Sequence, residues 1–495
     1  MSCFTRWLLV LVLLALAAAS CTTSSQEPAS PSAGGSALTA TSIEPRPLPT
    51  AAPPTTTEPP ERSLPLPQLD IWAFPGPTHY EGDVLTLVVP LGGFSDHKLL
   101  SASLTIDGEL IDSEAQLSGD PLLGDMVVFR DAYKTSGMVG GHSIQVTAQV
   151  EPGGEVLASQ WVTVVAETER PAQETASRWR VERTECCNLR YQENTAASRD
   201  LAELVAVVDE ATARVEEHFG RKLPQVEFVL IDTLWGNGGY AGNEVVVSYL
   251  DRDFSPGRRT TFRQTVLHEL AHAMTDWFEY STPWPLIEGV AVQFTQGHFK
   301  PEPLGPRARA LSDAGELPPL DVLFDTFPDM QHETRYVAVG AFTEFLVSEH
   351  GFDELLDLFD SELDIATPSR WLDAAATEVL GQPLSAIQSA FDAWVGGFEP
   401  RDQALDLQLT IALQEARRAF QAAHDPYPNY FVFASVRETG QAGLTMRDPV
   451  DVRLVAVEAL IAYAQDLIIE GELEAARDVV AAVEQVVADS AVGSG

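Results

Sequence analysis

Five consecutive residues, His268-Glu269-Leu270-Ala271-His272, carry the clearest sign of chemistry in this sequence of 495 residues. On an α-helix, residues four positions apart lie on the same face, so both imidazoles can reach one metal ion. Glu269 then lies close enough to accept a proton from a water molecule whose pKa zinc lowers to about 7. The motif therefore predicts one zinc ion held by His268 and His272, with Glu269 as the general base.

The residues around this motif predict the helix that it needs. Apolar side chains recur along the segment at helical spacing, at Val266, Leu267, Leu270, Ala271, Met274 and Phe278. Two prolines, Pro283 and Pro285, end it. Metzincin peptidases carry a glycine three residues, and a histidine six residues, after the second histidine of the motif. Thr275 and Phe278 occupy those positions here, which excludes that class.

A glutamate that can complete the metal site follows at position 288. It stands in Trp284-Pro-Leu-Ile-Glu288-Gly289-Val-Ala291, which resembles the Trp-x-x-Glu-Gly-x-Ala element of the gluzincin metallopeptidases, the clan of thermolysin-like and aminopeptidase-like enzymes. The resemblance covers about residues 180–398, within which residues 214–220 and 336–351 are also similar to the small membrane-linked, peptidase MA-like proteins of bacteria. The resemblance implies that Glu288 is the third zinc ligand. Two histidines, one carboxylate and one water form the open arrangement of a catalytic zinc ion.

The resemblance also implies roles for residues outside the ligand set. Tyr336 stands where members of the clan often carry a tyrosine that donates a hydrogen bond to the tetrahedral oxyanion. A tyrosine of the core is the alternative, and the nearby His332 could do the same work. Asp276 follows His272 by one helical turn, so its carboxylate can accept a hydrogen bond from a ligand imidazole or can be a solvated helix residue.

Residues 244–249 have the pattern of a β-strand and precede the metal helix. In the gluzincins the corresponding strand lies at the edge of a sheet and binds an extended peptide. The resemblance therefore implies that Val245, Val246 and Val247 contact the substrate. Aminopeptidases of the clan carry a Gly-x-Met-Glu-Asn element that captures a free amine, and residues 239–244 match it only faintly. The faint match gives little support for an aminopeptidase. The sequence therefore favours an endopeptidase or a peptidase of unspecified type.

The N-terminus is typical of a targeting segment. Arg6 precedes an apolar run over residues 7–19, which is typical of a signal peptide and short for a membrane span. The run ends Ala18-Ala19-Ser20-Cys21, which resembles the bacterial lipobox; a plain secretory peptide with an incidental cysteine is the alternative. We therefore expect a signal peptide over residues 1–20 and a lipid anchor on Cys21. The protein would then be tethered in the bacterial cell envelope, outside the cytoplasm.

Shifts in composition along the chain and the turn residues between its segments predict a multidomain fold. Pro, Ser and Thr make up 26 of the 46 residues from 22 to 67, which predicts a tether over residues 21–67. Short β-rich runs separated by glycine turns predict an antiparallel β-sandwich-like domain over residues 68–168. A central α+β gluzincin-like domain over residues 178–398 and an all-α extension over residues 401–495 complete the expected organisation. The adjacent Cys186 and Cys187 allow either a ring disulfide or two reduced thiols.

The net charge of −41 excludes nucleic-acid binding by counterion release, which needs a basic surface. Six histidines stand singly and are predicted to be surface or core residues: His79, His97, His142, His218, His298 and His350. The favoured function is a membrane-tethered extracytoplasmic peptidase that hydrolyses peptides or proteins with metal-activated water. The alternative is a catalytically inactive surface lipoprotein that uses the same fold for binding or scaffolding. The oligomeric state stays open.

Overall fold

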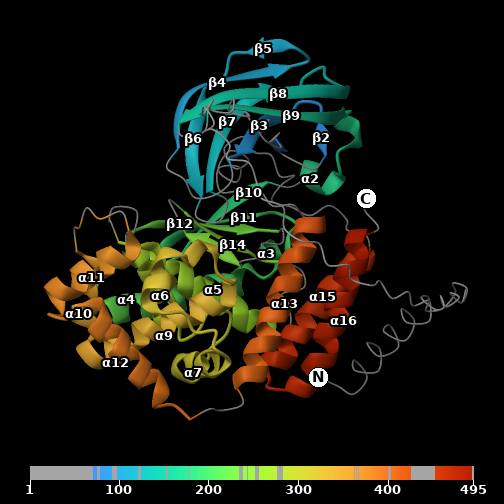
Figure 1. Cartoon of the computed structure of the whole chain (residues 1–495). Helices are drawn as coiled ribbons and strands as arrows, with labels where there is room; N and C mark the ends of the chain where they lie inside the picture. The colour runs from blue at the N-terminus through green and yellow to red at the C-terminus, as the bar shows by residue number, and fades with distance from the viewer. Residues whose placement is uncertain are drawn as a thin grey trace, which may run out of the picture. The chain divides into compact units, whose positions relative to one another are not determined.

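The computed structural model describes residues 71–74, 78–91, 97–120, 124–151, 154–176, 178–232, 238–241, 244–250, 256–275, 282–361, 363, 365, 367–399, 403–424 and 452–492. The predicted signal peptide, the predicted lipid anchor at Cys21, the predicted tether and Asp276 lie outside these ranges. The chain is a mixed, multidomain α+β protein (Figure 1). Within the described ranges, no helix is both long enough and apolar enough to cross a membrane.

Residues 72–165 form two β-sheets that share one hydrophobic core. The first sheet has the order β1-β3-β7-β6, with bounds Trp72–Phe74, Val84–Pro90, Gly124–Lys134 and Ala115–Asp120. The second has the order β2-β9-β8-β4-β5, with bounds His79–Tyr80, Gly154–Val165, Gly140–Glu151, Lys98–Ile106 and Glu109–Ile111. Phe129 from the first sheet and Ile144 from the second both lie in the core between them. One pairing differs from the expected antiparallel pattern, because β2 runs parallel to β9.

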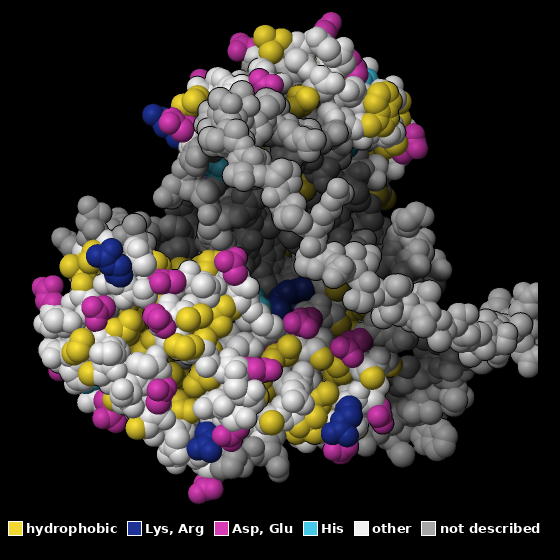
Figure 2. Space-filling view, viewed as in Figure 1, with side chains coloured by type: hydrophobic (Ala, Val, Ile, Leu, Met, Phe, Trp, Pro, Cys, Tyr) yellow, Lys and Arg dark blue, Asp and Glu magenta, His cyan; other side chains and the backbone are white. Residues whose placement is uncertain are grey.

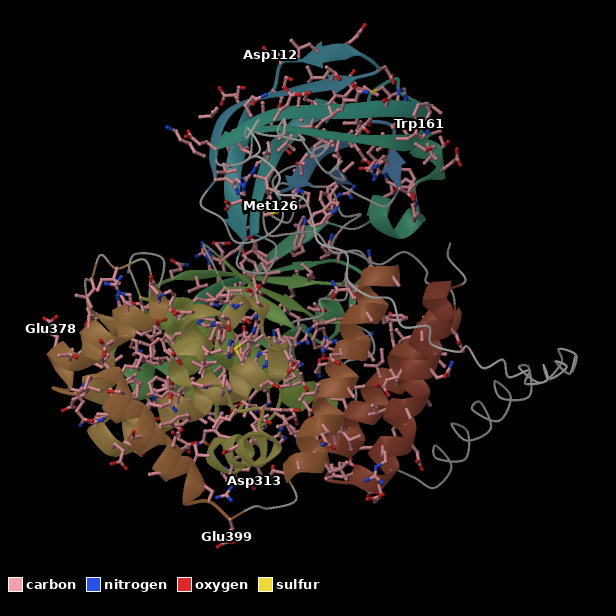
Figure 3. The ribbon with its side chains drawn as sticks, viewed as in Figure 1. Asp112, Met126, Trp161, Asp313, Glu378 and Glu399 are labelled. Atoms are coloured by element: carbon pink, nitrogen blue, oxygen red, sulfur yellow. A yellow bond between two sulfur atoms is a disulfide. The ribbon has the colours of Figure 1, made fainter. Side chains whose placement is uncertain are left out.

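The second sheet carries an exposed tryptophan. Trp161 on β9 leaves 68 % of its surface exposed (Figure 3). Its indole lies against Gly141 of β8, where a Cβ atom would come within 2.4 Å of the ring. The glycine therefore makes room for the indole, which a larger residue would displace.

A third sheet carries the strand that precedes the metal helix. Its order is β10-β11-β12-β14-β13, with bounds Trp179–Arg183, Cys187–Gln192, Val226–Ile231, Val245–Ser248 and Gly239–Ala241. The three inner strands are parallel, and helix α4 (Leu201–Phe219) lies in the crossover between β11 and β12. The adjacent Cys186 and Cys187 form a disulfide where β11 begins.

The strand that carries the predicted substrate contacts, β14, is not at the edge of this sheet, so the expected edge position is wrong. β14 pairs with β12 on one side and with β13 on the other, which leaves Val245, Val246 and Val247 without a free hydrogen-bonding side. The physical reason is that β13 precedes β14 and folds back onto it as an antiparallel neighbour, with Gly239 opposite Val247. Within the described residues, the edge strand on this side is therefore β13.

Helices α5 (Pro256–Thr275), α6 (Trp284–Thr295) and α9 (His332–His350) carry the residues of the predicted metal site. Helix α5 contacts the third sheet through the main hydrophobic core, in which its Val266 and Leu270 lie with Val245 and Val247 of β14. Helix α5 follows β14 in the sequence, and it packs against both β14 and the edge strand β13. This packing fixes the position of the helix on the sheet. Among the described residues up to 396, the other α-helices are α2 (Ala172–Ala176), α3 (Ala196–Arg199), α7 (Leu304–Ala314), α8 (Leu320–Asp325), α10 (Phe352–Phe359), α11 (Pro368–Val379) and α12 (Leu384–Gly396).

Helices α6 and α9 approach each other closely at two glycines. A Cβ atom on Gly289 would lie 2.2 Å from Thr343 Oγ1, and one on Gly340 would lie 2.3 Å from Val292 Cγ1. No side chain larger than hydrogen fits at either contact without a shift of the helices. The glycine that follows Glu288 in the sequence motif therefore sets the distance between the two helices of the site.

Gly289→Ala is expected to destabilise the protein by about 1–3 kcal/mol, because overpacking outweighs the roughly 1 kcal/mol that alanine gains in helix propensity. Urea unfolding of the full chain measures the effect. Gly396→Ala, at a helical glycine with nothing within 4 Å of the added Cβ, is the matched control and should be neutral or slightly stabilising. Equal stability of the two variants would contradict the close-packing argument.

The C-terminal helices α13 (Gln403–His424), α15 (Val452–Ile469) and α16 (Leu473–Val492) pack on one another (Figure 1). Helix α13 also contacts the central helices through ion pairs. Asp406 lies 2.7 Å from Lys300 and 2.6 Å from Arg307, and Arg418 lies 2.7 Å from Glu333. Acidic side chains outnumber basic ones over the coloured face of the molecule in Figure 2, in keeping with the net charge of −41.

Candidate metal centre

Three predicted ligands meet at one point between α5 and α6. His268 Nε2 lies 3.1 Å from His272 Nε2 and 3.2 Å from Glu288 Oε2, and His272 Nε2 lies 3.3 Å from the same oxygen. All three side chains are buried. Ligand atoms about 2.0–2.1 Å from a tetrahedral zinc ion are about 3.3 Å apart, so these residues have the spacing and the donor types that fit zinc.

The fold explains why these three residues meet. His268 and His272 lie one turn apart on α5, which places their rings on one face of the helix. Glu288 lies in the second turn of α6, which packs against α5. The indole Nε1 of Trp284, one turn earlier on α6, donates a 2.8 Å hydrogen bond to Glu288 Oε1. This bond leaves Oε2 of Glu288 to face the histidines.

Burial and charge tune the ligands in opposite directions. Burial lowers the pKa of His268 to about 4, which keeps that imidazole neutral at pH 7. Burial also acts to lower the pKa of His272, but the Glu288 carboxylate outweighs it and the pKa is raised. Burial acts to raise the pKa of Glu288, but His272 and His268 hold it well below its ordinary value. The site thus presents an anionic carboxylate and an imidazole, that of His272, which holds its proton to a higher pH than an ordinary histidine and binds a metal only in its neutral form.

Glu269 lies beside the ligands and is not one of them. Burial raises the pKa of its carboxyl group to about 8, the charge of Glu288 adds to the rise, and His272 partly offsets it. A Cβ atom on Gly239 would lie 3.1 Å from Glu269 Oε1, so this carboxylate adjoins the edge strand β13. A group with a pKa in this range is suited to accept and return a proton near neutral pH.

Tyr336 reaches the same point from α9. Its ring centroid lies 6.3 Å from that of His268, and burial, with the Glu288 carboxylate adding to it, raises the pKa of the phenol, so the hydroxyl stays protonated and can donate a hydrogen bond. The sequence left open whether Tyr336 is a core residue or a residue of the site. The side chain is buried and also lies at the site. The ring of His332 stacks on Tyr336 with the centroids 4.5 Å apart.

Tyr336→Phe is expected to lower kcat by roughly 10²–10³-fold, the usual cost of removing one donor to an oxyanion. Zinc content should stay at one ion per chain, because the phenol is not a ligand in this arrangement. Initial rates and metal analysis of the two proteins provide the measurement. An unchanged kcat would place Tyr336 in the core only.

Three residues of the site have no signal in the sequence. His298, predicted to be a surface or core residue, is buried with its ring centroid 5.5 Å from that of His268. Glu333 bonds both His298 and His332, and Arg418 reaches Glu333 from α13. Their separations of 35 and 85 residues follow no local period, so only the packing of α9 and α13 brings them together.

No protein-family model matches this chain, and no curated protein matches it. Among solved structures, the chain is similar to the crystal structure of an aminopeptidase N family protein from Idiomarina loihiensis. The TM-score is 0.27 and the sequence identity 11 %, over 69 % of this chain and 75 % of that chain. A likeness of this size carries no argument, so the functional conclusion depends on the site residues.

Proposed function

We propose that this protein is a zinc-dependent peptidase of the gluzincin type that hydrolyses peptide bonds in an extracytoplasmic space. One observation carries the proposal. The buried donor atoms of His268, His272 and Glu288 lie 3.1–3.3 Å apart, with Glu269 next to them and outside the ligand set. Three protein ligands leave a fourth position open, which is the arrangement of catalytic rather than structural zinc.

A bound zinc ion would supply a Lewis acid for the scissile carbonyl group and would lower the pKa of a water molecule to about 7. Glu269 takes a proton from the attacking water and delivers it to the leaving amine. Tyr336 donates a hydrogen bond to the oxygen that becomes negative in the transition state. Trp284 holds the Glu288 carboxylate by its second oxygen, which fixes the ligand's orientation.

The edge strand β13 supports a peptide as the substrate. Gly239–Ala241 pair with β14 on one side, and within the described residues the other side of β13 has no strand neighbour. An extended peptide can add to such an edge by main-chain hydrogen bonds. Because Gly239 adjoins Glu269, a peptide bound there would pass the general base.

The sequence of the N-terminus supports the location. The apolar run of residues 7–19, the lipobox-like Cys21 and the proline-rich segment of residues 21–67 together favour a protein held by a lipid in the bacterial cell envelope. The substrate would then be a peptide or protein outside the cytoplasm. Mass spectrometry of the mature N-terminus tests this part, and an unmodified Cys21 would contradict it.

Metal analysis combined with a peptide-library profile tests the activity. The full mature chain, purified without added metal, is expected to hold one zinc ion and to cleave library peptides. A chelator should abolish cleavage, and added zinc should restore it. A protein without metal, or cleavage that is indifferent to the chelator, would favour the alternative of an inactive lipoprotein that uses this fold for binding.

A further inference from the structure

A second group of polar side chains adjoins the metal centre and has no part in the chemistry above. His298 Nδ1 lies 3.4 Å from Glu333 Oε2, and His332 Nδ1 lies 3.0 Å from Glu333 Oε1. Both rings stack on Tyr336, with centroid distances of 4.0 Å and 4.5 Å. The His298 ring is also 5.5 Å from that of His268. We call the rings of His298 and His332 the imidazole pair, and Glu333 is the carboxylate that both rings contact.

The donor set of two histidines and a glutamate repeats that of the metal centre, but its charge is already balanced. Arg418 from α13 lies 2.7 Å from Glu333 Oε1 and supplies the positive charge that a metal ion would bring. Glu288, in contrast, forms no ion pair with Lys or Arg among the described residues. A buried carboxylate that holds a guanidinium has no need of a second cation. The role of Glu333 is therefore better explained as holding the imidazoles of His298 and His332 in place than as binding a metal ion.

The hydrogen bonds to Glu333 decide which nitrogen of each ring carries the proton. An ionised carboxylate only accepts hydrogen bonds, so both Nδ1 atoms must donate. The pKa of Glu333 is held well below its ordinary value, because the bonds from His298 and His332 outweigh the effect of burial. In a neutral ring each Nε2 atom is then a hydrogen-bond acceptor, and neither Nε2 atom has a bonding partner in the part of the chain that the structure describes. The two rings lie against Tyr336, and the ring of His298 also lies near the metal ligand His268.

We propose that Nε2 of His298 and Nε2 of His332 bind the substrate by accepting hydrogen bonds from its nitrogen-bound hydrogens beside the scissile bond. Glu333 and Arg418 are positioning residues that fix the two rings and their tautomers. This inference rests on the proposed peptidase function and names one part of its substrate-binding site. The group that donates is either an interior amide N–H or the free α-ammonium of the peptide.

Two variants of His332 separate substrate binding from structure. In His332→Asn the amide nitrogen can replace Nδ1 and keep the bond to Glu333, but no atom replaces Nε2. In His332→Gln the amide group extends to the position of Nε2 and can restore an acceptor. The probe is the peptide that the wild-type protein cleaves best in the library profile, prepared with a free and with an acetylated N-terminus.

We expect His332→Asn to lower kcat/KM, chiefly through KM, while His332→Gln recovers most of the loss. An equal loss of roughly 3–10-fold on both peptides identifies an amide N–H as the donor, because that is the cost of one neutral hydrogen bond. A loss of roughly 10–100-fold on the free peptide alone identifies the α-ammonium, since bonds to charged groups cost more. Zinc should stay at one ion per chain in every variant.

Three outcomes overturn the inference in distinguishable ways. Wild-type cleavage with an unchanged kcat/KM in His332→Asn would show that the pair does not bind substrate. A second metal ion in the wild type that disappears in His332→Asn would make the group a metal site instead. A wild-type protein that cleaves nothing would defeat the proposed peptidase function, and this inference with it. If His332→Asn does not fold, His298→Asn and His298→Gln repeat the comparison at the other ring.

Discussion

Replacing Glu269 with glutamine is expected to lower the rate of peptide hydrolysis by about 10²–10⁴-fold while one zinc ion stays bound per chain. The carboxylate adjoins the three ligands without belonging to them, so the amide should leave the metal site intact. An amide cannot take a proton from water, and general acid–base groups contribute about 10²–10⁴-fold to rate. Initial rates and metal analysis of the same sample measure both effects. Full activity in Glu269→Gln would remove this residue from the mechanism.

The pH dependence of the wild type provides a second readout of Glu269. Burial raises the pKa of this carboxyl group to about 8 in the metal-free protein, and the positive charge of a bound ion would lower it again. The base works only when deprotonated, so kcat/KM should fall about tenfold for each pH unit below its pKa. The residual rate of Glu269→Gln should lack this acid limb. Glu269→Asp, which keeps the carboxylate but shortens the side chain, is the control.

Replacing Glu288 with glutamine is expected to lower the affinity for zinc by more than about 100-fold, the upper end of the loss known for residues that only support a ligand. The change removes the negative charge that faces both histidines and keeps the side-chain shape. Trp284→Phe is the comparison variant, because it removes the 2.8 Å bond to Glu288 Oε1 and keeps an aromatic ring against Phe327 and Arg335, and it should cost about 10–100-fold. Equal zinc affinity in Glu288→Gln and the wild type would exclude this residue as a ligand.

Zinc binding should also depend on pH and should stabilise the fold. His272, whose pKa Glu288 raises, must lose a proton to bind the ion, whereas His268, with a pKa of about 4, competes only in stronger acid. The affinity should therefore fall about tenfold for each pH unit below the pKa of His272. Titration calorimetry in buffers of different ionisation enthalpy counts this proton. Zinc at 1,000 times its Kd should add about 4 kcal/mol to the free energy of unfolding, and much less in Glu288→Gln.

The sequence predicted those parts of the site that lie within single helices. His268 and His272 are related by the helical period alone, whereas Glu288 is expected only from the resemblance of residues 284–291 to the gluzincin element. Tyr336 could be suspected from its segment, but its place beside the metal ligands depends on the packing of α9. Local spacing thus predicts which residues of one helix lie together, but not which residues of different helices meet.

The sequence could not predict features that depend on pairing between distant segments. Among the described residues, the strand at this edge of the third sheet is β13 rather than β14, because the three residues Gly239–Ala241 pair with β14 although their sequence has no pattern of a strand. The contact of Arg418 with Glu333 joins residues 85 positions apart and depends on where α13 packs. Neither contact has a period that could be read along the chain.

The ion pairs of Asp406 have a consequence for the evolution of the chain. One carboxylate from α13 pairs with Lys300 and Arg307, both buried in the central part of the protein, and Arg307 also pairs with the buried side chain of Glu302. Without α13, Lys300 would lose its ion-pair partner among the described residues, and breaking a buried pair costs about 3–5 kcal/mol. Homologues that lack the three C-terminal helices should therefore carry an uncharged residue at the position of Lys300, whereas Arg307 can keep its pair with Glu302. Loss of the helices and loss of this lysine are expected to occur together in a family tree.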